Sequence, residues 1–286
     1  MHLDIRDAGA ARPRNTVLVR RHGLVTRVTH WINAACFGLL LLSGLQIFNA
    51  WPRLYWGHHG ADEDSALLSI GAAYEGGQPR GFVRAGTVMV PTTGVLGVST
   101  VDGAPAERAF PGWLTLPSYQ DLAAGRRWHF FFAWCLVANG ALYLAWSLAS
   151  GHLRRDLLPA RAQLAPRHLW RETVDHARLR FPTGDAARRY NALQKISYLL
   201  VVAVLLPAML LSGLTMSPGL NAAFPALLDL FGGRQSARTV HFMSAAVLVL
   251  FVLVHLAMVL LSGPWNNLRS MITGRYAIEE AGAQHD

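Results

Sequence analysis

Charged side chains are scarce in this chain of 286 residues: Asp, Glu, Lys and Arg make up 15% of it, against about 25% in soluble proteins. The shortage is concentrated in four stretches that contain none of these residues: 28–52, 128–153, 196–228 and 239–268. Each is longer than the roughly 20 apolar residues with which a helix crosses a bilayer. The pattern excludes a soluble globular enzyme. Because the runs are continuously apolar, it also excludes a β-barrel, whose strands alternate.

The sequence therefore predicts an all-α integral membrane protein, a bundle of four transmembrane helices. The expected helices are Val28–Phe48, Trp128–Ser147, Leu193–Leu211 and Val240–Leu261. Pro207 is expected to kink the third helix, as membrane bundles tolerate. Cysteine is scarce as well: Cys36 and Cys135 both fall inside expected helices, so no disulfide framework is implied.

Positive charge is distributed unevenly over the segments between the helices. Segments 1–27, 154–195 and 269–286 together hold 18 Lys and Arg residues, whereas 53–127 and 229–238 hold 8. The positive-inside rule then places both termini in the cytoplasm. The net charge of +9 is thus a topology signal and predicts no nucleic-acid partner. The first 27 residues contain no apolar segment, so no cleavable signal peptide is expected.

The expected organisation follows from these segments. It comprises a cytoplasmic N-terminal segment (1–27), a membrane domain (28–268) with an extracytoplasmic loop (49–127) and a cytoplasmic loop (154–192), and a cytoplasmic tail (269–286). The 49–127 loop has twelve glycines and a β-prone run at Thr87–Val101. We expect it to form a small folded cap or docking surface; the alternative is a merely long loop. In the cytoplasmic loop, Leu169–Leu179 could form an amphipathic helix at the membrane interface.

Four of the twelve histidines, His30, His129, His241 and His255, fall inside the expected helices. Ionisable groups are costly at membrane depth, which makes each a candidate for function, although a lone histidine there can also serve as a helix–helix hydrogen bond. His241 and His255 are 14 residues apart, about 21 Å along one face of a helix. With the expected topology, His129 and His241 lie at outer depth and His30 and His255 at inner depth.

Two facing imidazoles at each of two depths are typical of axial haem ligands in a four-helix bundle. No Cys-x-x-Cys-His motif occurs, so the expected cofactors are two non-covalent b-type haems. Zinc is the rival interpretation, but it needs three or four close ligands. His58 and His59 with the acids at 62–64 could form a metal patch, or merely a polar turn. Small residues are expected where a haem macrocycle lies against a helix backbone, and the candidates are Gly38, Gly44, Gly140 and Gly213. Arginines could pair with the haem propionates, and the candidates are Arg126, Arg127 and Arg238 on the outer side and Arg20, Arg21 and Arg27 on the inner side.

A faint internal repeat accompanies the histidines. Leu42–Leu45, with the sequence Leu-Ser-Gly-Leu, recurs as Leu211–Leu214. An arginine also precedes the histidine that opens each even-numbered helix, Arg127 before His129 and Arg238 before His241. The repeat indicates two similar helix pairs, the second of which carries an additional histidine.

The run Arg27–Trp31 leading into an apolar helix, His129 opening the second helix, and His241 and His255 on the fourth resemble the bacterial cytochrome b561 family. That family includes the cytochrome b subunits of nickel–iron hydrogenases, formate dehydrogenase and thiosulfate reductase. The resemblance implies a four-helix di-haem subunit of the inner membrane that anchors an oxidoreductase and exchanges electrons with quinone. It implies that His129 and His241 ligate the outer haem, and His30 and His255 the inner one. The long 49–127 loop is most similar to the thiosulfate-reductase-like branch, whose partner contains molybdopterin.

The expected function is therefore electron transfer between membrane quinone and an extracytoplasmic catalytic partner, as a subunit rather than a self-sufficient enzyme. A homo-oligomer is left open. Two alternatives remain: a stand-alone superoxide:quinone oxidoreductase, which would need little beyond the helices, and a histidine-lined transporter. The transporter is disfavoured because Val247–Val252, between two of the histidines, is wholly apolar.

Overall fold

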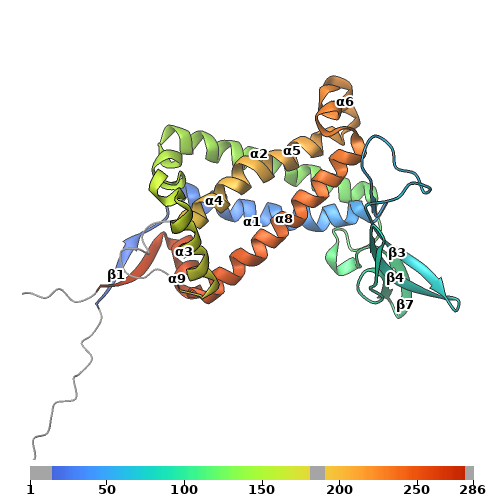
Figure 1. Cartoon of the computed structure of the whole chain (residues 1–286), viewed down its shortest axis with the longest axis horizontal. Coiled ribbons are helices and arrows are strands. Elements are labelled where there is room, and N and C mark those ends of the chain that lie inside the picture. The colour runs from blue at the N-terminus through green and yellow to red at the C-terminus, as the bar shows by residue number, and fades with distance from the viewer. Residues whose placement is uncertain (1–14, 181–190, 281–286) are drawn as a thin grey trace, which may run out of the picture. The chain divides into compact units, whose positions relative to one another are not determined.

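The computed structural model describes residues 15–180 and 191–280 (Figure 1). Residues 1–14, 181–190 and 281–286, which belong to the expected N-terminal segment, cytoplasmic loop and tail, lie outside the described residues, as do His2 and His285. The chain divides into two compact units. Unit 1 comprises Met1–Arg27, His152–Ile196 and His255–Asp286, and unit 2 comprises Val28–Gly151 and Ser197–Val254.

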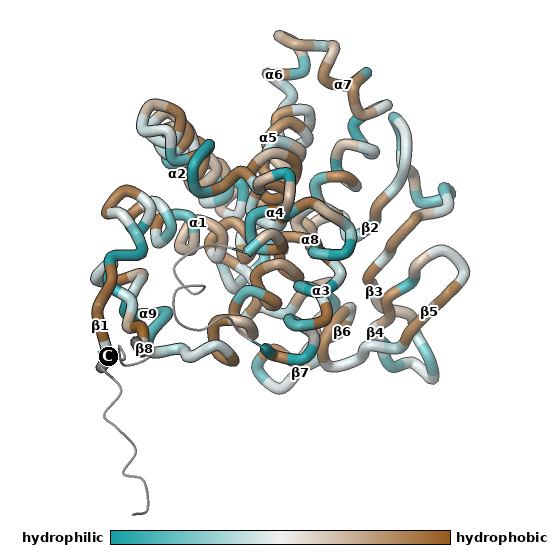
Figure 2. The backbone as a smooth tube through the Cα atoms, turned by 60° about the vertical axis from the view of Figure 1, so that its left-hand side comes forward, coloured by the Kyte–Doolittle hydropathy of each residue, from teal (hydrophilic) through white to brown (hydrophobic). Residues whose placement is uncertain are grey.

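Within the described residues, four helical segments are long and apolar enough to cross a membrane, as predicted. They are α1 (Leu24–Phe48), α2 (Leu122–Ala149), Ala192–Thr215 and α8 (Arg234–Leu261), and hydrophobic colouring follows them in Figure 2. α2 and α8 begin earlier than predicted, at Leu122 and Arg234. The reason is that a charge-free run marks only the part of a helix within the hydrocarbon layer. Long arginine side chains at its end can reach the headgroup region while the backbone stays helical.

The third apolar segment is interrupted in its middle. It consists of α4 (Ala192–Leu200), a π-helical turn η5 (Val201–Leu205) and α5 (Leu206–Thr215). Where the sequence predicts a kink at Pro207, the structure has this π turn directly before the proline. Proline lacks an N–H group and its ring collides with the carbonyl group four residues earlier, so a wider turn accommodates it.

The segment 49–127, called the cap from here on, corrects the expectation of an all-α chain. Strands β2 (Arg53–Leu54), β3 (Leu68–Glu75), β4 (Gln78–Ala85) and β5 (Val88–Pro91) form one antiparallel sheet in that order, and β6 (Gly97–Val101) pairs with β7 (Ala104–Arg108). Two of these strands fall within the predicted β-prone run. The hairpin turns at Gly76–Gly77 and Asp102–Gly103 have positive φ at both positions, as two-residue turns of type I′ require.

The core of the cap is continuous with the ends of two membrane helices in unit 2. Leu54, Ile70 and Ala109 of the cap bury together with Phe48, the last residue of α1, and Phe242 of α8 packs against this cluster. The cap is therefore a folded body attached to the helices rather than a long unstructured loop. Short helices complete unit 2: η1 (Gly112–Leu114), α6 (Pro218–Ala223) and α7 (Ala226–Phe231).

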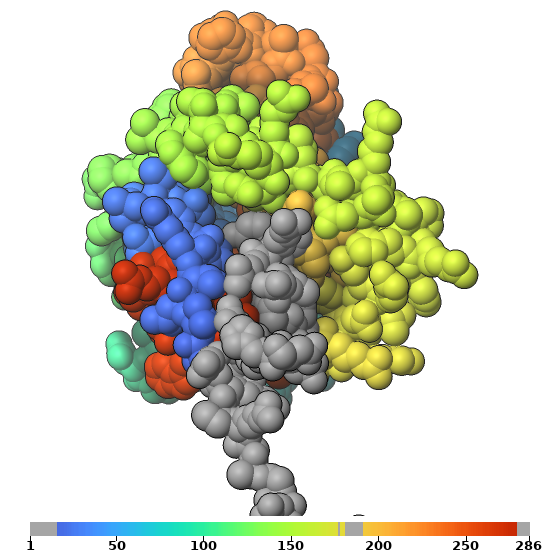
Figure 3. Space-filling model, turned by 90° about the vertical axis from the view of Figure 1, so that its left-hand side faces the viewer, coloured from blue at the N-terminus to red at the C-terminus, as the bar shows by residue number. Residues whose placement is uncertain are grey.

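Unit 1 joins the two ends of the described chain. β1 (Asn15–Arg20) runs antiparallel to β8 (Arg275–Glu280), and in Figure 3 the blue atoms of the N-terminal part lie against red atoms of the C-terminal part. The unit also contains α3 (Pro166–Ala177), which overlaps the predicted amphipathic segment, and α9 (Pro264–Thr273), together with η2 (Leu153–Leu157) and η3 (Arg161–Leu164). The first and last strands of the described chain are thereby paired with each other.

Candidate functional site

His129 of α2 and His241 of α8 face each other within unit 2. Their ring centroids are 6.2 Å apart and the ring planes are inclined by 60°. These two residues are 112 positions apart in the sequence, and their placement at one depth was predicted from the direction of each helix. The structure brings the outer pair together; ligation of a haem by the pair stays a prediction.

Hydrogen bonds determine which nitrogen of each imidazole is available. The Nδ1 atom of His241 is 3.0 Å from the Met209 carbonyl oxygen and 3.1 Å from Ser212 Oγ. Because a carbonyl oxygen only accepts, Nδ1 of His241 carries the proton and donates. Nε2 then holds the lone pair, the form of histidine that can bind a metal.

His129 has an equivalent environment. Its Nδ1 atom is 3.0 Å from Ser43 Oγ, and the ring also hydrogen-bonds the backbone of Leu40. The Ser43 hydroxyl donates to the Leu39 carbonyl oxygen at 2.7 Å, which leaves its oxygen lone pairs to accept from the imidazole. His129 therefore also has a free Nε2.

A glycine follows each of these serines and allows the imidazole to lie against the helix backbone. A Cβ atom built on Gly44 would be 3.3 Å from Cε1 of His129, and one on Gly213 would be 3.3 Å from Cε1 of His241. Of the four glycines proposed from the sequence, these two contact the imidazoles. A Cβ on Gly38 or Gly140 would meet nothing within 4 Å.

Ser43 and Ser212 have no role that the sequence alone predicts. The signal was nevertheless present, since both serines belong to the repeated Leu-Ser-Gly-Leu motif. The structure shows what the motif does: in each copy the serine contacts Nδ1 of a histidine on the following apolar helix, and the glycine leaves room for Cε1 of the same ring, to which an added Cβ would come within 3.3 Å.

The spacing of the two rings fits a metal ion bound between them. A metal–imidazole bond is about 2.0–2.1 Å long, and a ring nitrogen lies about 1.1 Å from its centroid, so two imidazoles on opposite sides of one ion have centroids about 6.2–6.4 Å apart. The observed separation is 6.2 Å. With both Nδ1 atoms engaged elsewhere, His129 and His241 fit a haem, which they would hold through Nε2.

The inner histidines are placed separately. His30 of α1 belongs to unit 2, where its ring centroid is 5.4 Å from that of Trp31. His255 of α8 belongs to unit 1, so its pairing with His30 stays a prediction. Next to His30, the Asn139 side chain of α2 donates to the Thr29 carbonyl oxygen at 2.9 Å and to Asn33 Oδ1 at 2.6 Å. This buried amide fastens α2 to α1 beside the histidine.

Other metal centres find no support in the part of the chain that the structure describes. No group of three or more His, Cys, Asp or Glu side chains there could hold an ion. Near His58 and His59, the Asp62 carboxylate pairs with Arg53, and Asp64 accepts a hydrogen bond from the Ala61 backbone. The alternative of a polar turn is favoured for this segment.

Several of the arginines proposed for the propionates have protein contacts. Arg238 donates to the Trp51 carbonyl oxygen and lies over the Phe48 ring, while Arg126 lies over Phe130 of its own helix. In unit 1, Arg27 donates to the Ile272 carbonyl oxygen. Their role toward a haem stays a prediction.

Arg108 fastens the cap to α1 through a buried guanidinium. It is 8% exposed and donates to the Ser118 carbonyl oxygen (2.7 Å), Gln46 Oε1 (3.0 Å) and Thr115 Oγ1 (3.1 Å). Burial lowers the pKa of this guanidinium below its ordinary value. Because Gln46 also donates to the Tyr119 carbonyl oxygen at 2.9 Å, the last turn of α1 and the end of the cap form one polar network.

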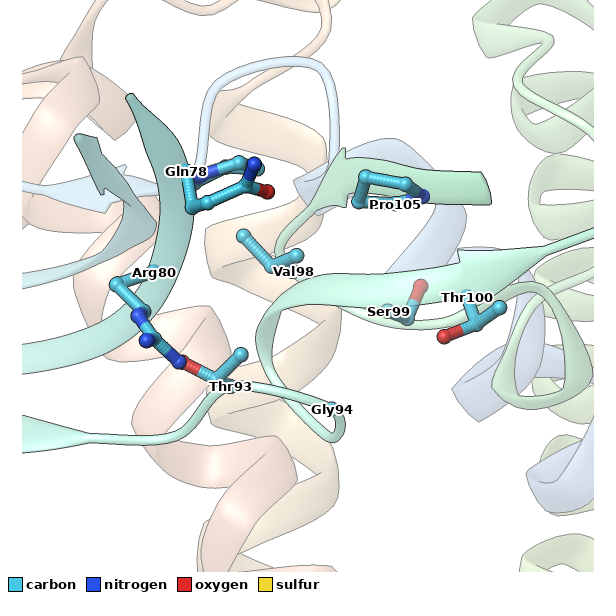
Figure 4. Close-up of a pocket in the computed structure, with 9 residues that line it drawn as sticks. Gln78, Arg80, Thr93, Gly94, Val98, Ser99, Thr100 and Pro105 are labelled. Atoms are coloured by element: carbon cyan, nitrogen blue, oxygen red, sulfur yellow. The ribbon is translucent and has the colours of Figure 1, made fainter. Parts of the chain in front are cut away.

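The cap is also bound to the start of α8. Thr239 Oγ1 donates to the Tyr55 carbonyl oxygen at 2.6 Å, and the Gly57 N–H donates to Ser236 Oγ at 2.6 Å. A shallow cavity of about 370 Å³ opens within the cap between β4, which contributes Gln78 and Arg80, and β6, which contributes Ser99 (Figure 4). None of the four membrane histidines lines it.

Comparison with known proteins agrees with these features. Residues 21–274 match the family described as prokaryotic cytochrome b561. A protein of Azospira oryzae, named as a candidate protein-methionine-sulfoxide reductase subunit YedZ1, is 35% identical over 235 residues, which cover 82% of this chain and 87% of that protein. With its four apolar helices, the chain belongs to the prokaryotic cytochrome b561 family of bacterial integral membrane proteins that bind haem b.

Proposed function

We propose that this chain is a di-haem cytochrome b subunit that conducts electrons across the membrane between quinone and an extracytoplasmic oxidoreductase. The observation that carries the proposal is the His129–His241 pair, with ring centroids 6.2 Å apart and both Nδ1 atoms held by serines. In this proposal His129 and His241 hold an outer haem, and His30 and His255 an inner one. A bound haem supplies a one-electron iron couple.

The side chains around the pair determine what such a site can do. Imidazoles on both faces would fill the two axial positions and leave no site for a small ligand, which favours electron transfer over oxygen chemistry. The run Val247–Val252, between His241 and His255 on α8, contains no polar or ionisable side chain that could relay protons between the two levels. The chain would thus conduct electrons between the two levels without conducting protons along α8.

The topology is part of the proposal. We place both termini in the cytoplasm and the cap outside, with the inner loop 154–192 and the tail 269–286 facing the cytoplasm. The pairing of β1 with β8 supports this arrangement because it requires both ends of the chain on one side. The bonds from the cap to the start of α8 likewise support a shared side for 49–127 and 229–238.

The cap is the proposed docking surface for the partner. Among the described strands, β5 pairs with β4 alone, and Val88, Met89 and Val90 on it are all exposed. An unpaired apolar edge strand is a site where another polypeptide adds main-chain hydrogen bonds. Since the Azospira relative is named as a subunit of a methionine-sulfoxide reductase, we propose a catalytic reductase subunit, of the molybdopterin type, as the occupant. A stand-alone superoxide:quinone oxidoreductase has no partner protein that would bind to the β5 edge.

The proposal is tested on purified full-length protein in proteoliposomes. We expect two b-type haems per chain in the dithionite-reduced absorption spectrum, and oxidation of both when a water-insoluble quinone is added. A colourless preparation, or one haem per chain, would contradict the di-haem proposal. Co-purification of a catalytic subunit with the wild type, but not with a variant carrying lysine at Val88 and Val90, separates the subunit role from the stand-alone alternative.

A further inference from the structure

Ser43 and Ser212 are both fully buried, and each lies on the helix opposite a proposed outer ligand. The Oγ–Nδ1 distances are 3.0 Å to His129 and 3.1 Å to His241. Each hydroxyl also donates to the carbonyl oxygen four residues earlier in its own helix, Leu39 at 2.7 Å and Ala208 at 2.5 Å. The hydroxyl proton is therefore used within the helix, and the oxygen is presented to the imidazole as an acceptor.

We propose that Ser43 and Ser212 are positioning residues that hold both imidazoles in the Nδ1–H form with Nε2 turned toward one shared iron. The inference rests on the proposed function, because it concerns the same outer site. It goes beyond the assignment of the ligands, because it states what fixes their tautomer and tunes their basicity.

The chemistry of the contact predicts the direction of its effect. An acceptor on Nδ1–H increases the electron density of the imidazole and strengthens it as a metal ligand. A stronger donor stabilises ferric over ferrous iron, and inside a membrane bundle the low dielectric enlarges such effects. The two serines should therefore lower the reduction potential of the outer haem.

The neighbouring glycines make the contact possible. A side chain at position 44 or 213 would press on Cε1 of the imidazole, since an added Cβ lies only 3.3 Å from it. Serine followed by glycine thus provides an acceptor for Nδ1 and space for the rest of the ring. The same two-residue arrangement occurs on α1 and on α5, so both ligands are held in the same way.

The test compares Ser43→Ala, Ser212→Ala and the double variant with the wild type by redox titration and EPR of the outer haem. Ser147→Ala is the matched control, because Ser147 is a buried serine of α2 whose Oγ atom has no hydrogen-bond partner among the described residues. We expect the double variant to shift the preference of the site from ferric toward ferrous iron about tenfold, which is about 59 mV upward for one electron. Each single variant should have a smaller effect than the double variant, since each imidazole keeps a backbone hydrogen bond, His129 with Leu40 and His241 with Met209.

The EPR g values and the reduction potential of the outer haem decide whether the two serines position the imidazoles. Altered EPR g values and a raised reduction potential of the outer haem in the alanine variants support the inference. Ser43→Thr, which keeps a hydroxyl group, and the control Ser147→Ala should both keep the wild-type values. Wild-type potential and g values in the double variant overturn the inference. Should the variants fail to assemble, pulsed EPR of the wild type measures the Nδ1 protons directly, and a ligand lacking that proton overturns the inference as well. A wild type without an outer haem would instead contradict the proposed function.

Discussion

Alanine in place of His129 or of His241 is expected to remove one and the same haem, leaving about half the wild-type haem content per chain. Without one imidazole the proposed site would have one of its two ligands, and the remaining ring would not hold the haem alone. Alanine at His30 or His255 should remove the other haem. Haem content by pyridine haemochrome, together with redox titration of the remaining haem, identifies which of the two has been lost.

The matched control is His58→Ala, because His58 lies in the cap outside the membrane helices and should leave both haems in place. A crossed result, in which His129→Ala and His241→Ala remove different haems, would refute the assignment of the pairs. A chain that keeps both haems after His241→Ala would remove the basis of the electron-transfer proposal.

Arg108→Ala is expected to lower the free energy of unfolding of the cap by about 2–4 kcal/mol. The substitution removes a buried guanidinium and leaves Gln46 Oε1, Thr115 Oγ1 and the Ser118 carbonyl oxygen without the donor that each now has. The haems should be retained, since their proposed ligands are on the helices, whereas binding of the catalytic subunit should be weakened. Thermal unfolding in detergent and limited proteolysis of 49–127 measure the first effect, and co-purification measures the second.

Arg84→Ala provides the comparison for this prediction. Arg84 is an exposed arginine of β4 that lies over the Phe82 ring, so its removal should change cap stability by less than about 1 kcal/mol. Equal stability of Arg108→Ala and the wild type would show that the buried network does not hold the cap to α1.

The four apolar helices could be predicted because crossing a membrane imposes a simple requirement, a long run without charge. The strands of the cap could not be located in the same way. They are short, are separated by glycines such as those at the Gly76–Gly77 turn, and bury only part of one face, so neither hydropathy nor alternation marks them clearly. The all-α expectation was wrong for this reason, although the run Thr87–Val101 did indicate two of the strands.

The outer histidine pair could be predicted from depth alone, because helix direction and helix rise fix how far each residue lies from a membrane face. The serines could not, since a single serine in an apolar helix is also common at plain helix–helix contacts. Only the contact of Ser43 and Ser212 with Nδ1 distinguishes the two interpretations. The pairing of His30 with His255 rests on the same depth argument and awaits the haem-content experiment.

The recurrence of the serine–glycine step has a consequence for the symmetry of the outer site. The α1–α2 pair and the α5–α8 pair make equivalent contacts. Ser43 corresponds to Ser212, Gly44 to Gly213 and His129 to His241, and the corresponding distances agree within 0.1 Å. The contacts that hold the two imidazoles are thus of the same kind and length for both rings. A haem bound there as proposed would therefore have two ligands of similar strength, and neither would be expected to dissociate first.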